Sequence, residues 1–254
     1  MIIKTDIERA SLIEGGKRLA RILATLRERV APGVTAEELD DLAEQMIRDG
    51  GDEPCFLGYI PEGATRPYPA ALCVSINDEI VHGIPNESVK VLKEGDIVGL
   101  DLGLIHGGIV VDAATTVGVG HVSEDSKKLM WATESALVAG IAEAKVGGRL
   151  GDISHAIQKE IESAGFTVVK ELGGHGVGSE VHEEPFISNF GKSGTGPVLE
   201  EGMVLALEPI SSAGKAAVTI APDGYTFRTK DGSRSAHFEH TVLVTKNGPE
   251  VITK

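Results

Sequence analysis

Two similar ten-residue segments, LKEGDIVGLD at 92–101 and LEEGMVLALE at 199–208, decide the fold of this chain. They share Leu, Glu and Gly at matching positions and an apolar run. Each ends in a carboxylate, Asp101 in the first segment and Glu208 in the second. A short apolar run that follows a Gly-containing turn is typical of a buried strand. The repeat therefore predicts two related halves, each with a strand that leads to an acidic residue.

The helices before each segment repeat as well. Apolar spacing predicts helices over residues 7–30 and 124–145. A shorter helix follows each of them, beginning at the Thr35-x-x-Glu capping box in the first half and covering about 152–164 in the second. Any two amphipathic helices can be aligned in this way, so the helices alone leave coincidence open. At one offset, Gly33, Glu38, Leu39, Ile47 and Gly51 align with Gly147, Asp152, Ile153, Ile161 and Gly165.

The remaining apolar runs predict strands. Those at 96–104 and 109–119 are separated by His-Gly-Gly, so we expect them to form a hairpin. This pattern predicts an α/β (α+β) protein with one domain over 1–254, made of two halves at about 5–120 and 121–254 whose strands meet at a central site. Further strands are expected at 71–76, 166–172, 202–210, 216–220 and 236–245.

Composition excludes several classes of partner. The chain has 24 Lys and Arg against 38 Asp and Glu, for a net charge of −14, which argues against binding DNA or other nucleic acid. No stretch approaches the roughly 18 apolar residues of a membrane span, and charged residues follow the first methionine where a secretory signal would be apolar. Two cysteines are too few for a disulfide framework. We therefore expect a cytoplasmic protein with no membrane partner.

Two aspartates of the predicted hairpin are candidates for chemistry. Asp101 lies between Gly99 and Gly103 on one face of an apolar strand, which leaves space around its carboxylate. Asp112 lies in the apolar run of the next strand. A buried carboxylate costs several kcal/mol unless it is paired or binds a metal. For each acid alone, an exposed turn or edge position is the alternative.

The second half repeats this arrangement. Glu208 ends the apolar run 203–207 without an adjacent base, and Arg234 is the basic residue nearest to Glu239. Four carboxylates in apolar strands require a common cation. Two divalent ions would supply the charge of +4 that balances them, whereas one ion would leave the cluster negative.

Histidines complete the candidate site. His175 lies in GGHGVG, which matches neither a dinucleotide-binding fingerprint nor a P-loop, so we expect the glycines to let the backbone pass close to a metal while His175 presents a nitrogen. His182 lies seven residues further on and is a candidate substrate contact. His82 lies between a short apolar strand and a Gly-x-Pro turn, which favours a site residue. Hydrogen-bonded or surface positions are expected for His106, His121 and His155.

Five separated motifs together resemble the type I methionine aminopeptidases, over essentially the whole chain. The resemblance implies the duplicated pita-bread fold, with a central, mainly antiparallel sheet, helices on its outer face and pseudo-two-fold halves. It implies two divalent ions bound by Asp101, Asp112, His175, Glu208 and Glu239. This ligand set leaves Mn²⁺, Fe²⁺, Co²⁺ and Zn²⁺ open. The motifs are SINDEIVHGIP (75–85), the two aspartates eleven residues apart, GGHGVGSEVHEEP (173–185), MVLALEPI (203–210) and SAHFEHTV (235–242).

The resemblance also implies an activity, namely removal of the N-terminal (initiator) methionine from nascent proteins and peptides with a small second residue. Glu208 would handle the proton of the attacking water, and His82 and His182 would hydrogen-bond the substrate. The partner would be a peptide or nascent-chain N-terminus, bound by a monomer. Docking to the ribosome stays open, since no contiguous basic face marks it. The pocket for the methionine side chain would consist of Tyr59, Tyr68, Cys73, Val181 and Tyr225.

The sequence departs from the family pattern at several positions. Val-Val precedes Asp112 where the family usually has Gly, Val181 replaces a common aromatic residue, and Tyr225 replaces a frequent tryptophan. The segment 60–67 is longer than usual. Two alternatives follow. One is an Xaa-Pro aminopeptidase, whose relatives generally have a long extra N-terminal domain, whereas only about 100 residues precede Asp101 here. The other is a metal-free pita-bread protein that binds partners without catalysis, although such relatives lose ligands that are all present in this chain.

Overall fold

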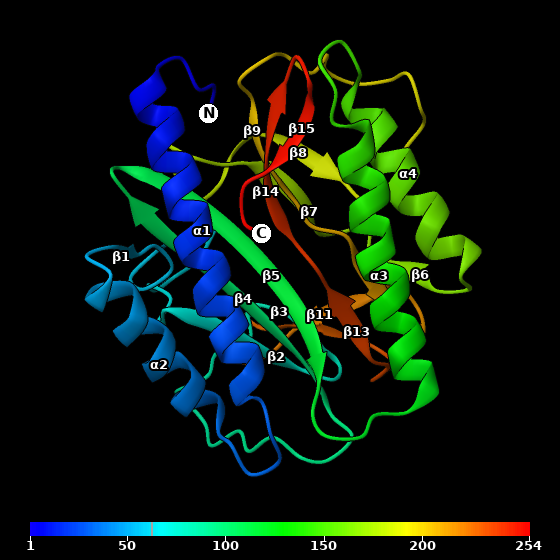
Figure 1. Ribbon diagram of the computed structural model, residues 1–254. Helices are drawn as coiled ribbons and strands as arrows, with labels where there is room; N and C mark the ends of the chain where they lie inside the picture. Colours follow the sequence, from blue (N-terminus) through cyan, green and yellow to red (C-terminus); the bar gives the residue numbers. More distant parts are fainter. Residues whose placement is uncertain (62) are drawn as a thin grey trace.

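The computed structural model describes residues 1–61 and 63–254 and contains four helices (Figure 1). They are α1 (Asp6–Arg29), α2 (Ala36–Asp49), α3 (Glu124–Glu143) and α4 (Leu150–Ser163). All four helices predicted from the sequence are confirmed to within about two residues at each end. Their starts follow from local hydrogen bonding. In α1 and α2 a threonine caps the helix and a glutamate three residues later returns the bond, as in Thr35 and Glu38.

The strands form antiparallel pairs throughout the described residues. They are β1 (Glu53–Pro54), β2 (Leu72–Ile76), β3 (Glu79–Val81), β4 (Ile97–His106), β5 (Ile109–Gly118), β6 (Thr167–Val168), β7 (Gly173–Gly176), β8 (Glu183–Ser188), β9 (Val204–Leu207), β10 (Ile210–Ser212), β11 (Val218–Ile220), β12 (Phe227–Thr229), β13 (Ser235–His237), β14 (His240–Thr245) and β15 (Gly248–Val251).

The hairpin of β4 and β5 is the longest strand pair, and it confirms the predicted hairpin. Its two strands pair in continuous register from Ile97 opposite Gly118 to His106 opposite Ile109. Gly107 and Gly108 form the turn with φ of 57° and 79°. Positive φ at both turn positions is what a two-residue hairpin of this twist requires, and glycine adopts it without strain.

Two strands predicted as continuous in the second half are each broken. The expected strand 202–210 divides into β9 and β10 at Glu208 and Pro209, because proline has no N–H to continue the ladder. The expected strand 236–245 divides into β13 and β14 at Phe238 and Glu239. The expected strand 166–172 is reduced to β6. Each of the two breaks thus occurs at a glutamate of the candidate site.

Helices cover the strands in two groups, each with its own hydrophobic core. α1 and α2 pack on β2, β4 and β5, whereas α3 and α4 pack on each other and on strands of the second half (Figure 1). The predicted mixed α/β class with antiparallel sheets is confirmed. No helix among the described residues combines the length and the apolar character that a membrane span needs.

The two halves are joined at β5. Glu239 donates its N–H to the carbonyl of Ala114 at 2.9 Å, and the N–H of Ala114 returns a bond to Glu239 at 3.3 Å. Asp112 N–H donates to Oγ1 of Thr241, at 2.9 Å. These bonds fix the break between β13 and β14 against the strand that contains Asp112. The acidic residues of both halves therefore meet at this seam.

Candidate active site

Asp101 and Asp112 lie on the same face of the central hairpin. Asp112 is directly opposite Gly103, and Asp101 is opposite Ala114 on β5 and Cys73 on β2. These small neighbours leave the space that the two carboxylates occupy. Both acids are buried, and Oδ1 of each lacks a hydrogen-bond partner among residues 1–61 and 63–254. A buried carboxylate oxygen without a donor indicates that a ligand outside the protein satisfies it.

Glu208 and Glu239 reach the same space from the broken strands of the second half. The Glu208 carbonyl accepts a bond from Nδ2 of Asn189 at 2.8 Å, which fixes the backbone where β9 ends. Glu239 is 2% exposed, and its Oε1 also lacks a hydrogen-bond partner in the part of the chain that the structure describes. Three of the four predicted acidic ligands therefore have an oxygen that no described residue satisfies.

His175 faces these carboxylates with one defined ring nitrogen. Its Nδ1 lies 2.9 Å from the carbonyl of Gly176, so Nδ1 bears the hydrogen and Nε2 keeps its lone pair. Nε2 is 3.5 Å from Oε1 of Glu208. One ligand atom each from Asp112, His175 and Glu239 lie within 4.8 Å of one another. Asp101 and Glu208 line the same cavity as these three residues, so the structure brings together all five predicted ligands.

The glycines on either side of His175 are required by the packing of neighbouring strands. A Cβ on Gly174 would lie 2.3 Å from the carbonyl oxygen of Ala206, and one on Gly176 would lie 2.4 Å from that of Glu184. These contacts are with β9 and with the start of β8, so the glycines allow β7 to fit between neighbouring backbones. The expectation that they also bring the backbone close to a metal stays a prediction.

Burial dominates the electrostatics of the cluster. It raises the pKa of Asp101 to about 7, with a further contribution from the charge of Glu208. Burial also raises the pKa of Asp112, Glu208 and Glu239 well above their usual range. The pKa of His175 is lowered to about 3 by burial, which keeps the imidazole neutral. Four carboxylates, three of them with an unsatisfied oxygen, and one neutral imidazole fit Mn²⁺, Fe²⁺, Co²⁺ or Zn²⁺.

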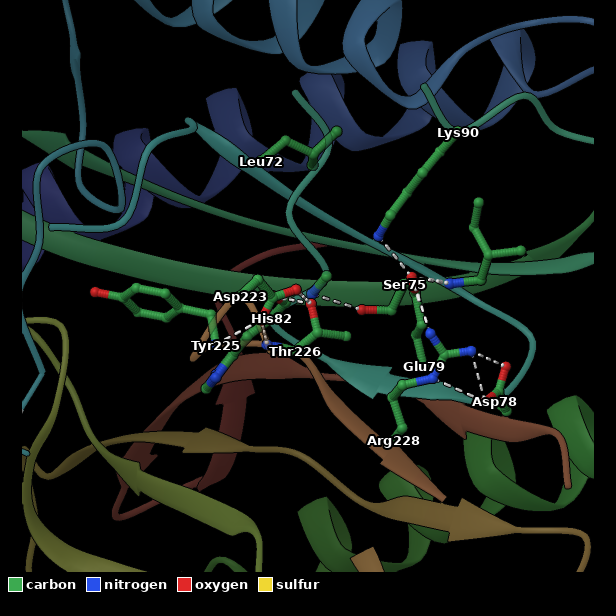
Figure 2. A network of polar contacts seen from close by, with 12 residues as sticks. Leu72, Ser75, Asp78, Glu79, His82, Lys90, Asp223, Tyr225, Thr226 and Arg228 are labelled. Carbon is green, nitrogen blue, oxygen red and sulfur yellow. Dashed lines mark hydrogen bonds and ion pairs between the residues drawn. The ribbon is translucent and has the colours of Figure 1, made fainter. Parts of the chain in front are cut away.

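His82 is held at the cavity by a strained turn and the polar network of Figure 2. Its φ is +56°, a left-handed conformation that is uncommon for residues with a side chain. The carbonyl of His82 accepts a bond from Oγ1 of Thr226 at 3.4 Å. Next to it, β3 pairs with β12, and Glu79 accepts a bond from Lys90 at 2.8 Å. Burial lowers the pKa of His82 to about 3, so its ring is neutral.

His182 lines the same cavity as His82 and is more exposed. Its Nδ1 is 2.9 Å from the hydroxyl of Tyr59, and its ring stands edge-on to His175 with 4.5 Å between centroids. The hydroxyl of Tyr59 thus fixes the orientation of this imidazole. Both histidines can contact a ligand that lies over the carboxylate cluster.

All twelve predicted site residues line one cavity. At its apolar end the rings of Tyr68 and Tyr225 meet edge-on at 5.2 Å. The hydroxyl of Tyr225 donates to the carbonyl of Arg66, and the guanidinium of Arg66 lies 5.5 Å from the Tyr225 ring centre. This places the end of the 60–67 segment beside the cavity, while residue 62 of that segment lies outside the described residues. The apolar end is completed by Cys73 and Val181.

Sequence reasoning missed three residues that also line the cavity: Phe56, Pro61 and Val81. Phe56 lies against the strand face that contains Asp101, where a Cβ on Gly103 would come within 3.0 Å of its ring. The glycine of that strand was therefore a signal that another side chain packs there. A fourth residue, His237, was passed over because it precedes Phe238 in an apparently continuous strand.

Comparison with known proteins assigns the class. A model of metallopeptidase family M24 matches residues 10–246, and the chain belongs to this family. The methionine aminopeptidase of Clostridium perfringens is 44% identical over 253 residues, with 100% of this chain and 98% of that protein covered. The crystal structure of methionine aminopeptidase from Thermotoga maritima superposes with a TM-score of 0.94 at 45% identity, with both chains fully covered.

These matches confirm the predicted family, the pita-bread fold and the methionine aminopeptidase class. An X-Pro aminopeptidase from Thermotoga maritima has a TM-score of 0.75 at 21% identity, which shows the shared fold alone, and the match covers only 62% of that chain. The comparison therefore favours the methionine enzyme over the Xaa-Pro alternative. Membership of a metallopeptidase family also confirms the predicted use of a divalent metal by a hydrolase.

Proposed function

We propose that this chain removes the N-terminal methionine from peptides and nascent proteins whose second residue is small. One observation supports this most strongly: the unsatisfied carboxylates of both halves converge on a single cavity whose other end is apolar. A metallopeptidase that removes methionine needs this combination. The cluster supplies the reaction centre, and the apolar end accommodates an unbranched thioether side chain.

The proposed cofactor is a pair of divalent ions, held by Asp101, Asp112, His175, Glu208 and Glu239. Two ions balance the four carboxylate charges, and the single neutral imidazole agrees with Mn²⁺, Fe²⁺, Co²⁺ or Zn²⁺. Such ions lower the pKa of water, polarise a carbonyl and stabilise the charge of a tetrahedral intermediate.

The protein's own groups have three proposed roles in the reaction. Glu208 accepts the proton of the attacking water on its carboxylate and passes it to the leaving amine nitrogen. His82 and His182, whose neutral rings face the cavity, hydrogen-bond the substrate and the intermediate. Tyr59 keeps His182 in its orientation through the bond to Nδ1. The buried walls exclude bulk water from the reacting bond.

The side-chain pocket is proposed to determine selectivity for methionine. Its wall consists of Tyr59, Tyr68, Cys73, Val181 and Tyr225, and the thiol of Cys73 is buried beside Tyr68. An unbranched apolar side chain fits between such groups, whereas a charged one would be desolvated without a partner. The tight space above the metal cluster is proposed to exclude large second residues.

The test compares Met-Ala-Ser with Ala-Pro-Gly as substrates, each with Mn²⁺ or Co²⁺ and with chelator. We expect metal-dependent release of methionine from the first peptide only. Cleavage of the proline peptide alone would overturn the assignment, and no metal-dependent cleavage of either would support a binding protein. Met-Leu peptides should be poor substrates, so efficient cleavage of them would refute the proposed preference for a small second residue.

We also propose the cellular setting of this activity. Two buried free thiols and an acidic pI of about 5.0 agree with a monomer in the reducing cytoplasm that meets nascent chains without binding nucleic acid. The chain is proposed to be one domain over 1–254, with halves at about 5–120 and 121–254 that share the site. Association with the ribosome would be tested by co-sedimentation at low and physiological salt.

A further inference from the structure

His237 is a buried histidine beside the site that has no role in the proposed reaction so far. It ends β13 and is only 4% exposed. Oγ1 of Thr116 accepts the backbone N–H of His237 at 2.9 Å and donates to the backbone carbonyl of His237 at 2.7 Å. Thr116 lies on the same face of β5 as Asp112. The backbone of His237 is therefore fixed relative to the acidic cluster.

The ring of His237 is directed at two of the proposed ligands. Its Nε2 is 3.5 Å from Oε2 of Glu208 and 3.7 Å from Oε2 of Glu239. Nε2 is fully buried and has no hydrogen-bond partner among the described residues. A buried ring nitrogen in this state costs free energy unless a small movement or a ligand satisfies it. The carboxylate of Glu208 is the nearest acceptor.

Glu208 lies between two imidazoles, one at each of its oxygens. Oε1 faces Nε2 of His175, and Oε2 faces Nε2 of His237, both at 3.5 Å. The two rings are not equivalent. The bond from Nδ1 of His175 to the carbonyl of Gly176 leaves a lone pair on its Nε2. Among the described residues no such bond to Nδ1 fixes the other tautomer of His237. When metal is bound and Glu208 is ionised, a lone pair on Nε2 of His237 would face carboxylate lone pairs.

We propose that His237 is a positioning residue that donates its Nε2–H to Oε2 of Glu208. This bond would orient the carboxylate, so that Oε1 stays turned toward His175 and the metal cluster while Glu208 transfers its proton. Groups that hydrogen-bond metal ligands in this way fix ligand orientation and raise metal affinity. The proposal rests on the proposed function at the same site, and it assigns to His237 a hydrogen bond without direct metal binding.

Three variants distinguish a hydrogen-bond donor from a direct metal ligand and from a residue that only fills space. His237→Gln keeps an N–H at about the distance of Nε2 from the backbone, His237→Asn has one bond fewer and does not reach, and His237→Leu removes the donor. We expect the Gln variant to keep kcat within about threefold of the wild type, because the donated bond is retained. The Asn and Leu variants should lose about 10- to 100-fold in kcat and in affinity for Mn²⁺, with KM nearly unchanged.

Metal binding and the visible spectrum of the Co²⁺-loaded protein supply readouts that do not depend on turnover. If His237 donates to Glu208 and does not bind the metal, the Co²⁺ bands of the Gln variant stay at the wild-type positions. If Gln and Leu variants both change the Co²⁺ spectrum and both lose activity, His237 is a direct ligand and the proposal is wrong. Wild-type kcat and Mn²⁺ affinity in the Leu variant would also overturn it.

Two controls keep the outcomes distinct. Thermal unfolding of each metal-free variant shows whether it folds. If the Leu variant is unstable, comparison of the Gln and Asn variants still shows whether the donated hydrogen bond is needed. A wild-type protein that binds Mn²⁺ but releases no methionine would refute the proposed function. A wild-type protein that releases methionine, together with an Asn variant that does so equally well, would refute only the role of His237.

Discussion

The two halves of the molecule share a scaffold but differ where they reach the active site. In the first half the N–H of Gly33 donates to the carbonyl of Leu92 at 2.8 Å. In the second, Gly147 donates to Leu199 at 2.9 Å. The start of the shorter helix forms an isolated bridge in each half, from Thr35 to Val91 and from Arg149 to Val198. The similar segments 92–101 and 199–208 therefore begin at equivalent places.

The difference lies in the strands that present the acids. The first half places Asp101 and Asp112 on two unbroken ten-residue strands. The second half places Glu208 and Glu239 at interruptions between short strands. An aspartate can reach the centre directly from a regular strand. At an interruption the backbone is free of the strand register, and the longer glutamate side chain spans the remaining gap. The shorter aspartates are thus presented by regular strands, and the longer glutamates by interruptions between strands.

The largest expected effect comes from removing one ligand charge in either half. We expect Asp112→Asn and Glu239→Gln each to abolish turnover, a loss well beyond the roughly 10- to 100-fold typical of residues that only support a ligand. The measurement is kcat on Met-Ala-Ser with saturating Mn²⁺. Asp125→Asn, which removes an exposed acid from α3, is the matched control and should leave kcat unchanged. Near-native activity in either ligand variant would remove that residue from the site.

A second prediction concerns the pH dependence of the metal-free protein. Burial raises the pKa of Asp101 to about 7, so the folded protein holds a proton that the unfolded chain has released. This contribution to stability is complete below the pKa of about 3.9 of an exposed aspartate and is lost as pH rises through about 7. We expect the Tm measured with chelator, taken relative to that of an Asp101→Asn variant, to fall between about pH 5 and about pH 7.

Metal should reverse this loss. Mn²⁺ replaces the protons, so its stabilising effect should grow over the same pH range and reach about 2.7 kcal/mol at a hundredfold excess over Kd. Differential scanning calorimetry with and without Mn²⁺ measures it. The Asp112→Asn variant is the control and should show a smaller increase. An equal Mn²⁺-induced shift in Tm at both pH values would contradict a cluster whose carboxylates are protonated without metal.

The sequence predicted the regular parts of this comparison and missed the irregular ones. Helices with capping boxes and the Gly107-Gly108 hairpin follow from local rules, so they were predicted closely. Pro209 is a local signal for the break at Glu208. The break at Phe238 and Glu239 has no local signal in the sequence, because it results from the backbone hydrogen bonds between Glu239 and Ala114. His237 was missed for the same reason. Its position depends on Thr116, more than a hundred residues earlier.

A third prediction tests a clamp that the described residues form in the first half. Oδ1 of Asp40 on α2 accepts the N–H groups of Ala71 and Leu72, both at 2.9 Å, where β2 begins. The equivalent residue on α4 is Ser154, whose hydroxyl donates to the carbonyl of Leu150 within its own helix. Asp40→Ala should lower the free energy of unfolding by about 2 kcal/mol or more, because two buried N–H groups lose their acceptor.

Urea unfolding measures both residues of this pair. Ser154→Ala should cost less than about 1 kcal/mol, because its hydroxyl bonds to a carbonyl of the same helix. Equal losses in the two variants would mean that the clamp contributes nothing specific to the first half. Because burial raises the pKa of Asp40 to about 6, the effect should be measured above that pH, where the carboxylate is ionised.

The smallest effect is expected at the starts of the shorter helices. Thr35 caps α2 by accepting the N–H of Glu38 at 3.2 Å, whereas Arg149 at the same place in α4 has no side-chain acceptor. Asp152 still accepts the N–H of Arg149 at 2.8 Å, so α4 has half of a capping box. Thr35→Ala should cost about 1 kcal/mol of stability.

Arg149→Thr would complete the capping box in the second half and make the two helix starts alike. The gain should be limited to about 0.5 kcal/mol, because the variant also loses the bond from the arginine to the carbonyl of Gly196. Urea unfolding of the two variants and of the double variant measures the difference. If Arg149→Thr destabilises by as much as Thr35→Ala, then Arg149 stabilises α4 through its contact with Gly196, and the two halves begin their helices by different means.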